Sequence, residues 1–153
     1  MKKVLSILMM VVFAISAIAK DKGLAYDISG VSSGNDGTYM VKVYVYEKKP
    51  SDALLKAAAV HGVVFRGFSG TQSRVTQKAL TQPEEEAQHA DFFEAFFKED
   101  GGCQNFAEVV VGSYETVKMK KGYKTGAIIN VNRSALRKHL EQAGVIKKLG
   151  SIF

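Results

Sequence analysis

Apolar and polar residues alternate along two segments near the beginning of the chain, and this alternation predicts a pair of strands. The longer segment runs from Thr38 to Glu47, and a shorter one runs from Tyr26 to Val31. A period of two places successive side chains on opposite faces of a strand. Residues 32–37 lie between the segments and are of the types that tolerate a tight turn. We therefore predict a hairpin with one buried face, carried by Tyr39, Val41, Val43 and Val45.

The apolar pattern changes to helical spacing after residue 50. Ser51 is suited to be the N-cap, and Asp52 follows at the positive end of the helix dipole. Apolar residues then recur at helical spacing as far as Phe65, and Gly67 is a natural stop, so the helix is predicted to run to Arg66. In an alternative interpretation, Gly62 ends the helix and releases residues 63–65 as extended chain.

Residues 68–83 show the least pattern, and they are predicted to form a mobile or loosely docked loop. A second helix is predicted over residues 84–98, with Thr81 as its N-cap in a capping box or, because of Pro83, with Gln82 in that role. Four aromatic residues of this helix are predicted to pack in the core, although an outer pair could instead fill a groove on a partner. They are Phe92, Phe93, Phe96 and Phe97.

The last third of the chain predicts a second hairpin and a closing helix. A long strand is expected from Phe106 to Lys120, with Val109, Val111, Val117 and Met119 on one face. A turn at Lys121-Gly122 then leads into a strand from Tyr123 to Asn132. The final helix should begin at Ser134 and end before Gly144, so that Val145 contacts Leu140.

The predicted order of elements is therefore strand, strand, helix, helix, strand, strand, helix. This order predicts a single α+β domain with a mainly antiparallel, four-stranded sheet and helices packed on one face. A single domain over residues 20–153 also fits the chain length.

The amino terminus predicts export. Lys2 and Lys3 precede an apolar run from Val4 to Ile15, and Ala17-Ile18-Ala19 fits a small-x-small cleavage site. The apolar run is shorter than the roughly 20 residues of a membrane-spanning helix. Residues 1–19 are therefore predicted to be a cleaved signal peptide, with a retained anchor as the alternative, and the product is expected in the periplasm or outside the cell.

Charge points weakly to acidic partners. Residues 20–153 hold 19 basic and 15 acidic residues, a net charge of +4, and the basic residues are spread along the chain. That surplus gives no support to nucleic-acid binding, so no nucleic-acid partner is predicted. The densest basic group is at the second hairpin: Lys118, Lys120, Lys121 and Lys124. These lysines either protect an exposed strand edge or contact an acidic envelope protein or an anionic envelope polymer.

Cys103 is the single cysteine, so it is either free or paired between chains. A nucleophilic role would require a basic partner such as His61, His89 or His139, and an environment that favours the thiolate. The cysteine follows the carboxyl end of a predicted helix, where the dipole disfavours a thiolate. We therefore predict a packed cysteine, and a cysteine-dependent hydrolase is the alternative.

Other candidate motifs are incomplete, so no metal or cofactor is predicted. Glu86 and His89 have the i, i+3 spacing of carboxylate–histidine metal sites, but a second such pair is missing from the sequence. Residues 122–125 lack the upstream glycine of a phosphate loop. The stretch Gly67-Phe68-Ser69-Gly70 is similar to an RNA backbone clamp, which does not suit an exported protein.

The sequence resembles the small envelope domains of the TolB amino-terminal and LPP20-type lipoprotein group. The resemblance lies in the order of elements, in the closing strand-then-helix segment from Ile128 to Leu140, and in an alanine-rich first helix with Ala53, Ala57, Ala58 and Ala59. It implies a non-catalytic binding or assembly module in the cell envelope. The lipid-attachment cysteine of the lipoprotein members is missing from this sequence, so membrane anchoring does not carry over.

Overall fold

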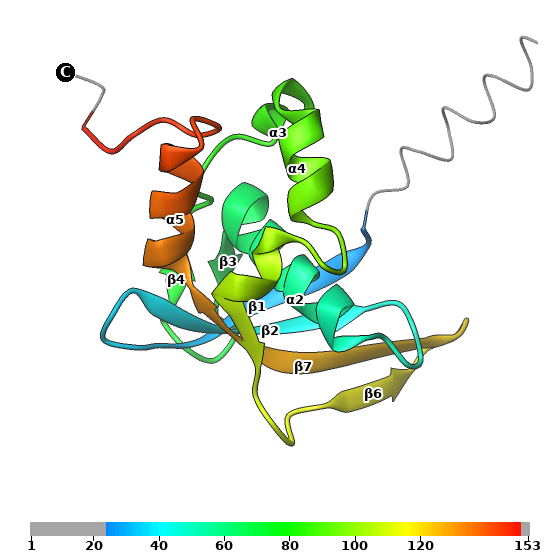
Figure 1. Ribbon diagram of the computed structural model, residues 1–153. Coiled ribbons are helices and arrows are strands. Elements are labelled where there is room, and N and C mark those ends of the chain that lie inside the picture. The colour runs from blue at the N-terminus through cyan, green and yellow to red at the C-terminus, as the bar shows by residue number, and fades with distance from the viewer. Residues whose placement is uncertain (1–23, 151–153) are drawn as a thin grey trace, which may run out of the picture.

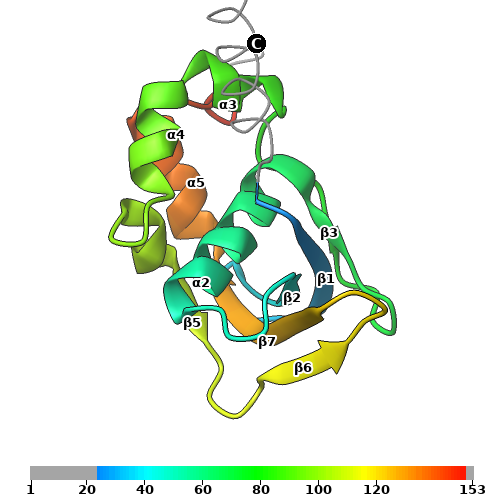
Figure 2. The same ribbon diagram turned by 90° about the vertical axis from the view of Figure 1, so that its right-hand side faces the viewer.

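The computed structural model describes residues 24–150, and the predicted signal peptide of residues 1–19 lies outside the described residues. The described chain folds into an antiparallel sheet with helices packed on one of its sides, as Figure 1 and Figure 2 show. The predicted α+β class is therefore confirmed. None of the helices between residues 24 and 150 is long and apolar enough to cross a membrane.

Five strands form the main sheet, where the sequence predicted four. β1 (Tyr26–Ser33) pairs with β2 (Thr38–Val45), and β2 pairs with the central strand β7 (Tyr123–Asn132). The other edge of β7 pairs with two short strands, β5 (Ala107–Val109) and β6 (Glu115–Lys118). The period of two is confirmed, because one face of β2 and β7 carries the buried side chains of Val41, Val43, Val45, Ala127, Ile129 and Val131.

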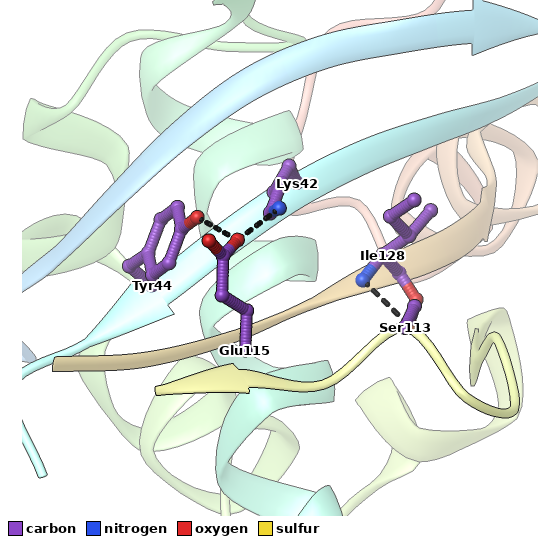
Figure 3. A network of polar contacts seen from close by, with 5 residues as sticks. All are labelled: Lys42, Tyr44, Ser113, Glu115 and Ile128. Atoms are coloured by element: carbon purple, nitrogen blue, oxygen red, sulfur yellow. Dashed lines mark hydrogen bonds and ion pairs between the residues drawn. The ribbon is translucent and has the colours of Figure 1, made fainter. Parts of the chain in front are cut away.

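The fifth strand arises because the predicted long strand from Phe106 to Lys120 is interrupted. Gly112 adopts a left-handed φ of 78° and turns the chain away from the sheet. Next to it, the Ser113 hydroxyl donates to the carbonyl of Val110 at 2.6 Å. It also accepts from the amide of Ile128 at 2.9 Å (Figure 3). The side chain of Ser113 thus replaces a backbone partner of β7. Val109 is paired with the buried Ile129, whereas Val117 is paired with Lys124 on the opposite face, so the predicted common face of Val109, Val111, Val117 and Met119 is wrong. Val111 itself is 95% exposed.

The first helix, α2 (Asp52–His61), covers the inner face of the sheet (Figure 2). The Ser51 hydroxyl accepts from the amide of Leu54 at 3.2 Å, so the predicted N-cap is confirmed. Beyond α2 the chain continues as one π-helical turn, residues 62–66, and Gly67, with a φ of 70°, ends it. The helical path therefore runs to Arg66 as predicted, and the alternative of an end at Gly62 is wrong.

The weakly patterned residues 68–83 are docked on the body of the protein by backbone hydrogen bonds, and most of their side chains are exposed or partly exposed. They contain a small antiparallel ladder of β3 (Phe68–Ser69) and β4 (Thr76–Gln77). The amides of Leu80 and Thr81 then donate to the carbonyls of Val63 and Val64, at 3.3 and 3.0 Å. These two carbonyls lie in the π-helical turn, and they fix a segment whose own side chains offer little apolar surface.

The predicted second helix is divided at His89 into α3 (Glu84–Gln88) and α4 (Ala90–Phe96). Neither Thr81 nor Gln82 caps it with a side chain, because the amide of Thr81 is engaged with Val64 and the helix begins directly after Pro83. The core prediction is confirmed for the four aromatic residues. Phe93 and Phe96 are buried, and Phe92 and Phe97 are partly buried against the core.

The chain closes with α5 (Arg133–Gln142), which begins one residue before the predicted start. Its N-cap is Asn132, whose side-chain oxygen accepts from the amide of Ala135 at 2.9 Å. The predicted end is confirmed, because the amide of Val145 donates to the carbonyl of Leu140 at 3.2 Å and Val145 is buried. This contact returns the chain to the core after the helix.

Candidate functional site

An open groove of about 1060 Å³ lies between the first helix and the α3–α4 pair. Its apolar lining includes Leu54, Phe93 and Phe97, and Leu24 and Ala25, directly before β1, also line it. The charged side chains among the lining residues are Arg66, Glu86 and Glu94. Such a combination of an apolar lining with few charged groups is typical of binding sites.

A chain of three polar side chains, Tyr26–His61–Glu86, crosses one wall of this groove. The Tyr26 hydroxyl lies 2.7 Å from Nδ1 of His61, and the two carboxylate oxygens of Glu86 lie 3.1 and 3.2 Å from Nε2. The imidazole is also enclosed by the rings of Phe65 and Phe97, at centroid distances of 5.0 and 5.2 Å. The three polar residues come from β1, α2 and α3, so the chain joins three elements.

Burial lowers the pKa of His61, and the guanidinium of Arg66 adds to this effect, whereas the nearby carboxylate of Glu86 opposes it. Burial raises the pKa of Tyr26, although Arg66 opposes that change. The stable arrangement at neutral pH is therefore a neutral imidazole that accepts from the Tyr26 hydroxyl and donates from Nε2 to Glu86. The contact between His61 and Glu86 is then a hydrogen bond to a carboxylate instead of an ion pair.

This chain of hydrogen bonds attaches α3 to the body of the protein. α3 buries none of its own side chains, so apolar packing contributes little to its position. Both nitrogens of His61 and the hydroxyl of Tyr26 are used in the attachment. The pattern of the sequence pairs Glu86 with His89 and gives no signal for this connection, because Glu86 and Tyr26 are 25 and 35 residues away from His61.

The hairpin lysines do not all lie on one surface. Lys118 is paired with Tyr123 across β6 and β7, whereas Lys124 is paired with Val117 and therefore lies on the opposite face of the sheet. On that face the ammonium of Lys124 is 3.7 Å from a carboxylate oxygen of Asp27 and 4.7 Å from the ring centroid of Tyr44. Lys118, Lys120 and Lys121 are exposed.

Two further lysines join the hairpin from the turn between β2 and α2. The ammonium of Lys48 lies 4.7 Å from the ring centroid of Tyr123, and the backbone carbonyl of Lys48 accepts from the hydroxyl of Thr125 at 2.9 Å. Lys49 follows and is also exposed. We call these five exposed lysines the basic end: Lys48, Lys49, Lys118, Lys120 and Lys121. Lys48 and Lys49 are not evident as members of this cluster in the sequence, because only the fold brings them to the hairpin.

The outer face of the sheet carries a closed polar network. Lys42 and Tyr44 each donate to one carboxylate oxygen of Glu115 at 2.6 Å, as Figure 3 shows. The hydrogen bond from Lys42 is the main cause that lowers the pKa of Glu115. Because β7 lies between β2 and β6, this carboxylate ties two strands across a third. The network is therefore better explained as a sheet contact than as a binding site.

Cys103 lies in a short 3₁₀ turn, residues 102–106, and its side chain is fully buried. Burial raises the pKa of its thiol, and the Gln104 amide lies 3.5 Å from the sulfur. The three candidate histidines are engaged elsewhere: His61 with Tyr26 and Glu86, His89 with Glu85, and His139 against the rings of Phe96 and Phe106. Neither accessibility nor acidity favours Cys103 as a nucleophile.

We expect the change Cys103→Ser to leave partner binding within a few-fold of the wild type. The native thiol should also react with a thiol reagent far more slowly than the same thiol in the unfolded chain, because reagent and base are both excluded from it. Loss of function by orders of magnitude, with an unchanged circular dichroism spectrum, would instead support a cysteine-dependent enzyme.

Glu86 and His89 do not share a site. Glu86 contacts His61, whereas Nε2 of His89 lies 3.4 Å from a carboxylate oxygen of Glu85. Across the described part of the chain, histidine, cysteine, aspartate and glutamate side chains do not gather in any group of three or more that could hold a metal ion.

Comparison with known proteins finds no matching family model, no matching curated protein and no matching solved structure.

Proposed function

We propose that this protein is an exported, non-enzymatic binding or assembly module of the bacterial cell envelope, and that its basic end contacts an anionic partner. The observation that carries the proposal is the convergence of five exposed lysines from two segments that are far apart in the sequence. Like charges that gather at one surface raise its potential and attract an oppositely charged partner. The resemblance to TolB-type and LPP20-type envelope domains suggests the same class of function.

The groups that could support catalysis are occupied in structural contacts. The imidazole of His61 is bonded at both nitrogens, and the thiol of Cys103 is buried. A general base must reach the proton that it removes, and a nucleophile must reach its substrate. These contacts favour a binding role over the alternative of a hydrolase.

Replacing Lys118, Lys120 and Lys121 with glutamine should weaken binding to dextran sulfate, used as a polyanionic probe, by about tenfold or more. Added salt should weaken binding of the wild type more than that of the variant, because exposed charges are screened over about 8 Å at physiological ionic strength. The free energy of unfolding should change little, since exposed charges contribute little to stability. Binding to the immobilised probe is measured over a salt series.

The matched control is Lys124→Gln, which removes a lysine of the same hairpin from the opposite face of the sheet, where it contacts Asp27 and Tyr44. This variant should bind the probe almost as well as the wild type. If the triple variant keeps both the affinity and the salt dependence of the wild type, the hairpin lysines serve only to protect the strand edge.

Export is tested on the native protein. Cleavage after Ala19 should produce a chain that begins at Lys20, because the site follows a charged segment and an apolar run. Intact-mass measurement of the protein purified from its own cells checks this. A mass that includes residues 1–19, or an added lipid, would show that the amino terminus acts as an anchor.

A further inference from the structure

Two surfaces of this protein are chemically complementary to each other. The groove is lined by apolar side chains and by the acidic residues Glu86 and Glu94. The tip of the β6–β7 hairpin presents the reverse combination, because it exposes 38% of the apolar side chain of Met119 between the cations of Lys118 and Lys120. An exposed apolar side chain among lysines at a hairpin tip is well suited to a partner that is apolar with an acidic rim.

The groove also has carboxylates that are accessible to a cation. Glu94 is exposed, and the side chain of Glu86 remains 44% exposed beside its contact with His61. Arg66 is the one cation among the groove residues, and it stacks on the ring of Tyr26 at 4.1 Å and donates to the Tyr26 carbonyl. The guanidinium of Arg66 is therefore engaged with Tyr26, whereas Glu94 is exposed and Glu86 is partly exposed.

The two surfaces lie at the same end of the sheet but at opposite edges. Tyr26, Val45, Thr125 and Thr116 are paired in one row across the four strands. The groove begins at the β1 side of this row, and the hairpin leaves the β6 side and points away from the body, as Figure 1 shows. Three strand spacings of about 4.8 Å each separate the two edges of this row. Because the hairpin also points away from the body, it does not reach the groove of its own copy.

We propose that the protein forms a symmetric dimer in which the lysine-tipped hairpin of each copy is seated in the groove of the other. Thr125 faces the helices, and Lys118 and Tyr123 share its face of the sheet, so the basic end and the groove both lie on the helical side. This placement on one side is compatible with a two-fold axis that brings each hairpin to the opposite groove, and such an assembly closes at two copies. This inference rests on the proposed function, because it makes the groove of a second copy the acidic partner of the basic end.

The first test is sedimentation velocity of the purified, exported protein over a range of concentrations. We expect a monomer–dimer equilibrium at about 0.05 M salt whose dissociation constant rises by about tenfold or more at about 0.5 M salt, because the contact joins exposed opposite charges. A protein that stays monomeric under all conditions, or one that forms species larger than a dimer, overturns the proposed assembly.

The second test uses one variant for each surface. The hairpin variant carries Lys118→Gln, Lys120→Gln and Lys121→Gln, and the groove variant carries Ala90→Arg, which places a cation at an exposed position of the groove lining. Each variant alone should be monomeric. A mixture of the two should form a heterodimer that is weaker than the wild-type dimer, because one of its two contacts joins an intact hairpin to an intact groove and the other joins the two altered surfaces. A mixture that shows no association at concentrations well above those at which the wild type dimerises overturns the pairing of these two surfaces.

Matched controls separate the contact from a general effect of charge. Ala95→Arg adds the same cation to the same helix, at an exposed residue outside the groove lining, and should dimerise like the wild type. A triple exchange of Lys78, Lys138 and Lys147 to glutamine removes the same charge from other exposed positions and should also dimerise. If Ala95→Arg prevents dimerisation as strongly as Ala90→Arg, the groove is not the contact.

The binding assay with dextran sulfate, run at protein concentrations at which the monomer predominates because the dimer covers the same lysines, distinguishes failure of this inference from failure of the proposed function. If the wild type binds the probe through its hairpin lysines but never dimerises, the proposed function is supported and the proposed dimer is overturned. If the wild type neither binds the probe nor dimerises, both proposals are overturned.

Discussion

Replacing Gly126 with valine should destabilise the protein by about 3 kcal/mol, the range expected when a larger residue is forced into a packed site. A Cβ atom at this position would lie 2.5 Å from both Cδ1 of Tyr44 and the carbonyl oxygen of Val43. Glycine therefore lets the tyrosine ring lie over β7 and reach Glu115. Displacement of that ring would also break the carboxylate contact that ties β2 to β6. Chemical denaturation of the purified protein measures the change.

The control is Ile128→Val, which alters the same face of the same strand by one methylene and should cost about 1 kcal/mol or less. A double-mutant cycle with Tyr44→Ala then assigns the effect. Gly126→Val should cost less in the Tyr44→Ala background, because part of the clash is gone. A loss of stability that is the same in both backgrounds would assign the whole effect to the backbone of Val43.

Replacing His61 with glutamine should lower the free energy of unfolding by about 2 kcal/mol at pH 8, because the variant loses ring packing and leaves part of a buried hydrogen-bonded chain without partners. It should also remove a pH dependence. Since burial lowers the pKa of His61 in the folded state, its stabilising effect is complete above the unfolded value of about 6.5. That effect is lost as the pH falls through the lowered folded-state pKa. The difference in the free energy of unfolding between wild type and variant should therefore become smaller at acidic pH.

Denaturation curves between about pH 8 and pH 5 measure this dependence. His89→Gln is the matched control, because it removes another histidine that pairs with a glutamate but is 36% exposed. His89→Gln should leave the pH dependence of the free energy of unfolding unchanged. If His61→Gln keeps the pH dependence of the wild type and His89→Gln loses that dependence, the groove wall is not the pH-sensitive element.

The pattern of the sequence predicts those elements whose limits are set by neighbouring residues. Strand β7 begins and ends at the predicted residues Tyr123 and Asn132, because a segment with Ala127, Ile129 and Val131 at alternate positions lies between a glycine turn and the start of a helix. The interruption at residues 110–114 is not predictable in this way. Three consecutive valines fit a strand on either face, and the hydroxyl of Ser113 replaces a backbone partner only once β7 lies beside it.

The site was less predictable than the fold, because its contacts join distant segments. The hairpin lysines are evident as a cluster in the sequence, but the separation of Lys124 from the others depends on strand register. The contribution of Lys48 depends on the path of the β2–α2 turn. His61 is enclosed by aromatic rings, but its partners Tyr26 and Glu86 could be found only in the folded chain.

The π-helical turn after α2 makes the following segment part of the same cooperative unfolding unit. The amide of Gly67 donates to the carbonyl of Gly62 across the wide turn, and the carbonyls of Val63 and Val64 bind the amides of Leu80 and Thr81. Opening of the helix end therefore also releases the residues that lead into α3. Proteins open locally in such connected units. The groove wall and the small β3–β4 ladder thus share their local stability with the end of the first helix.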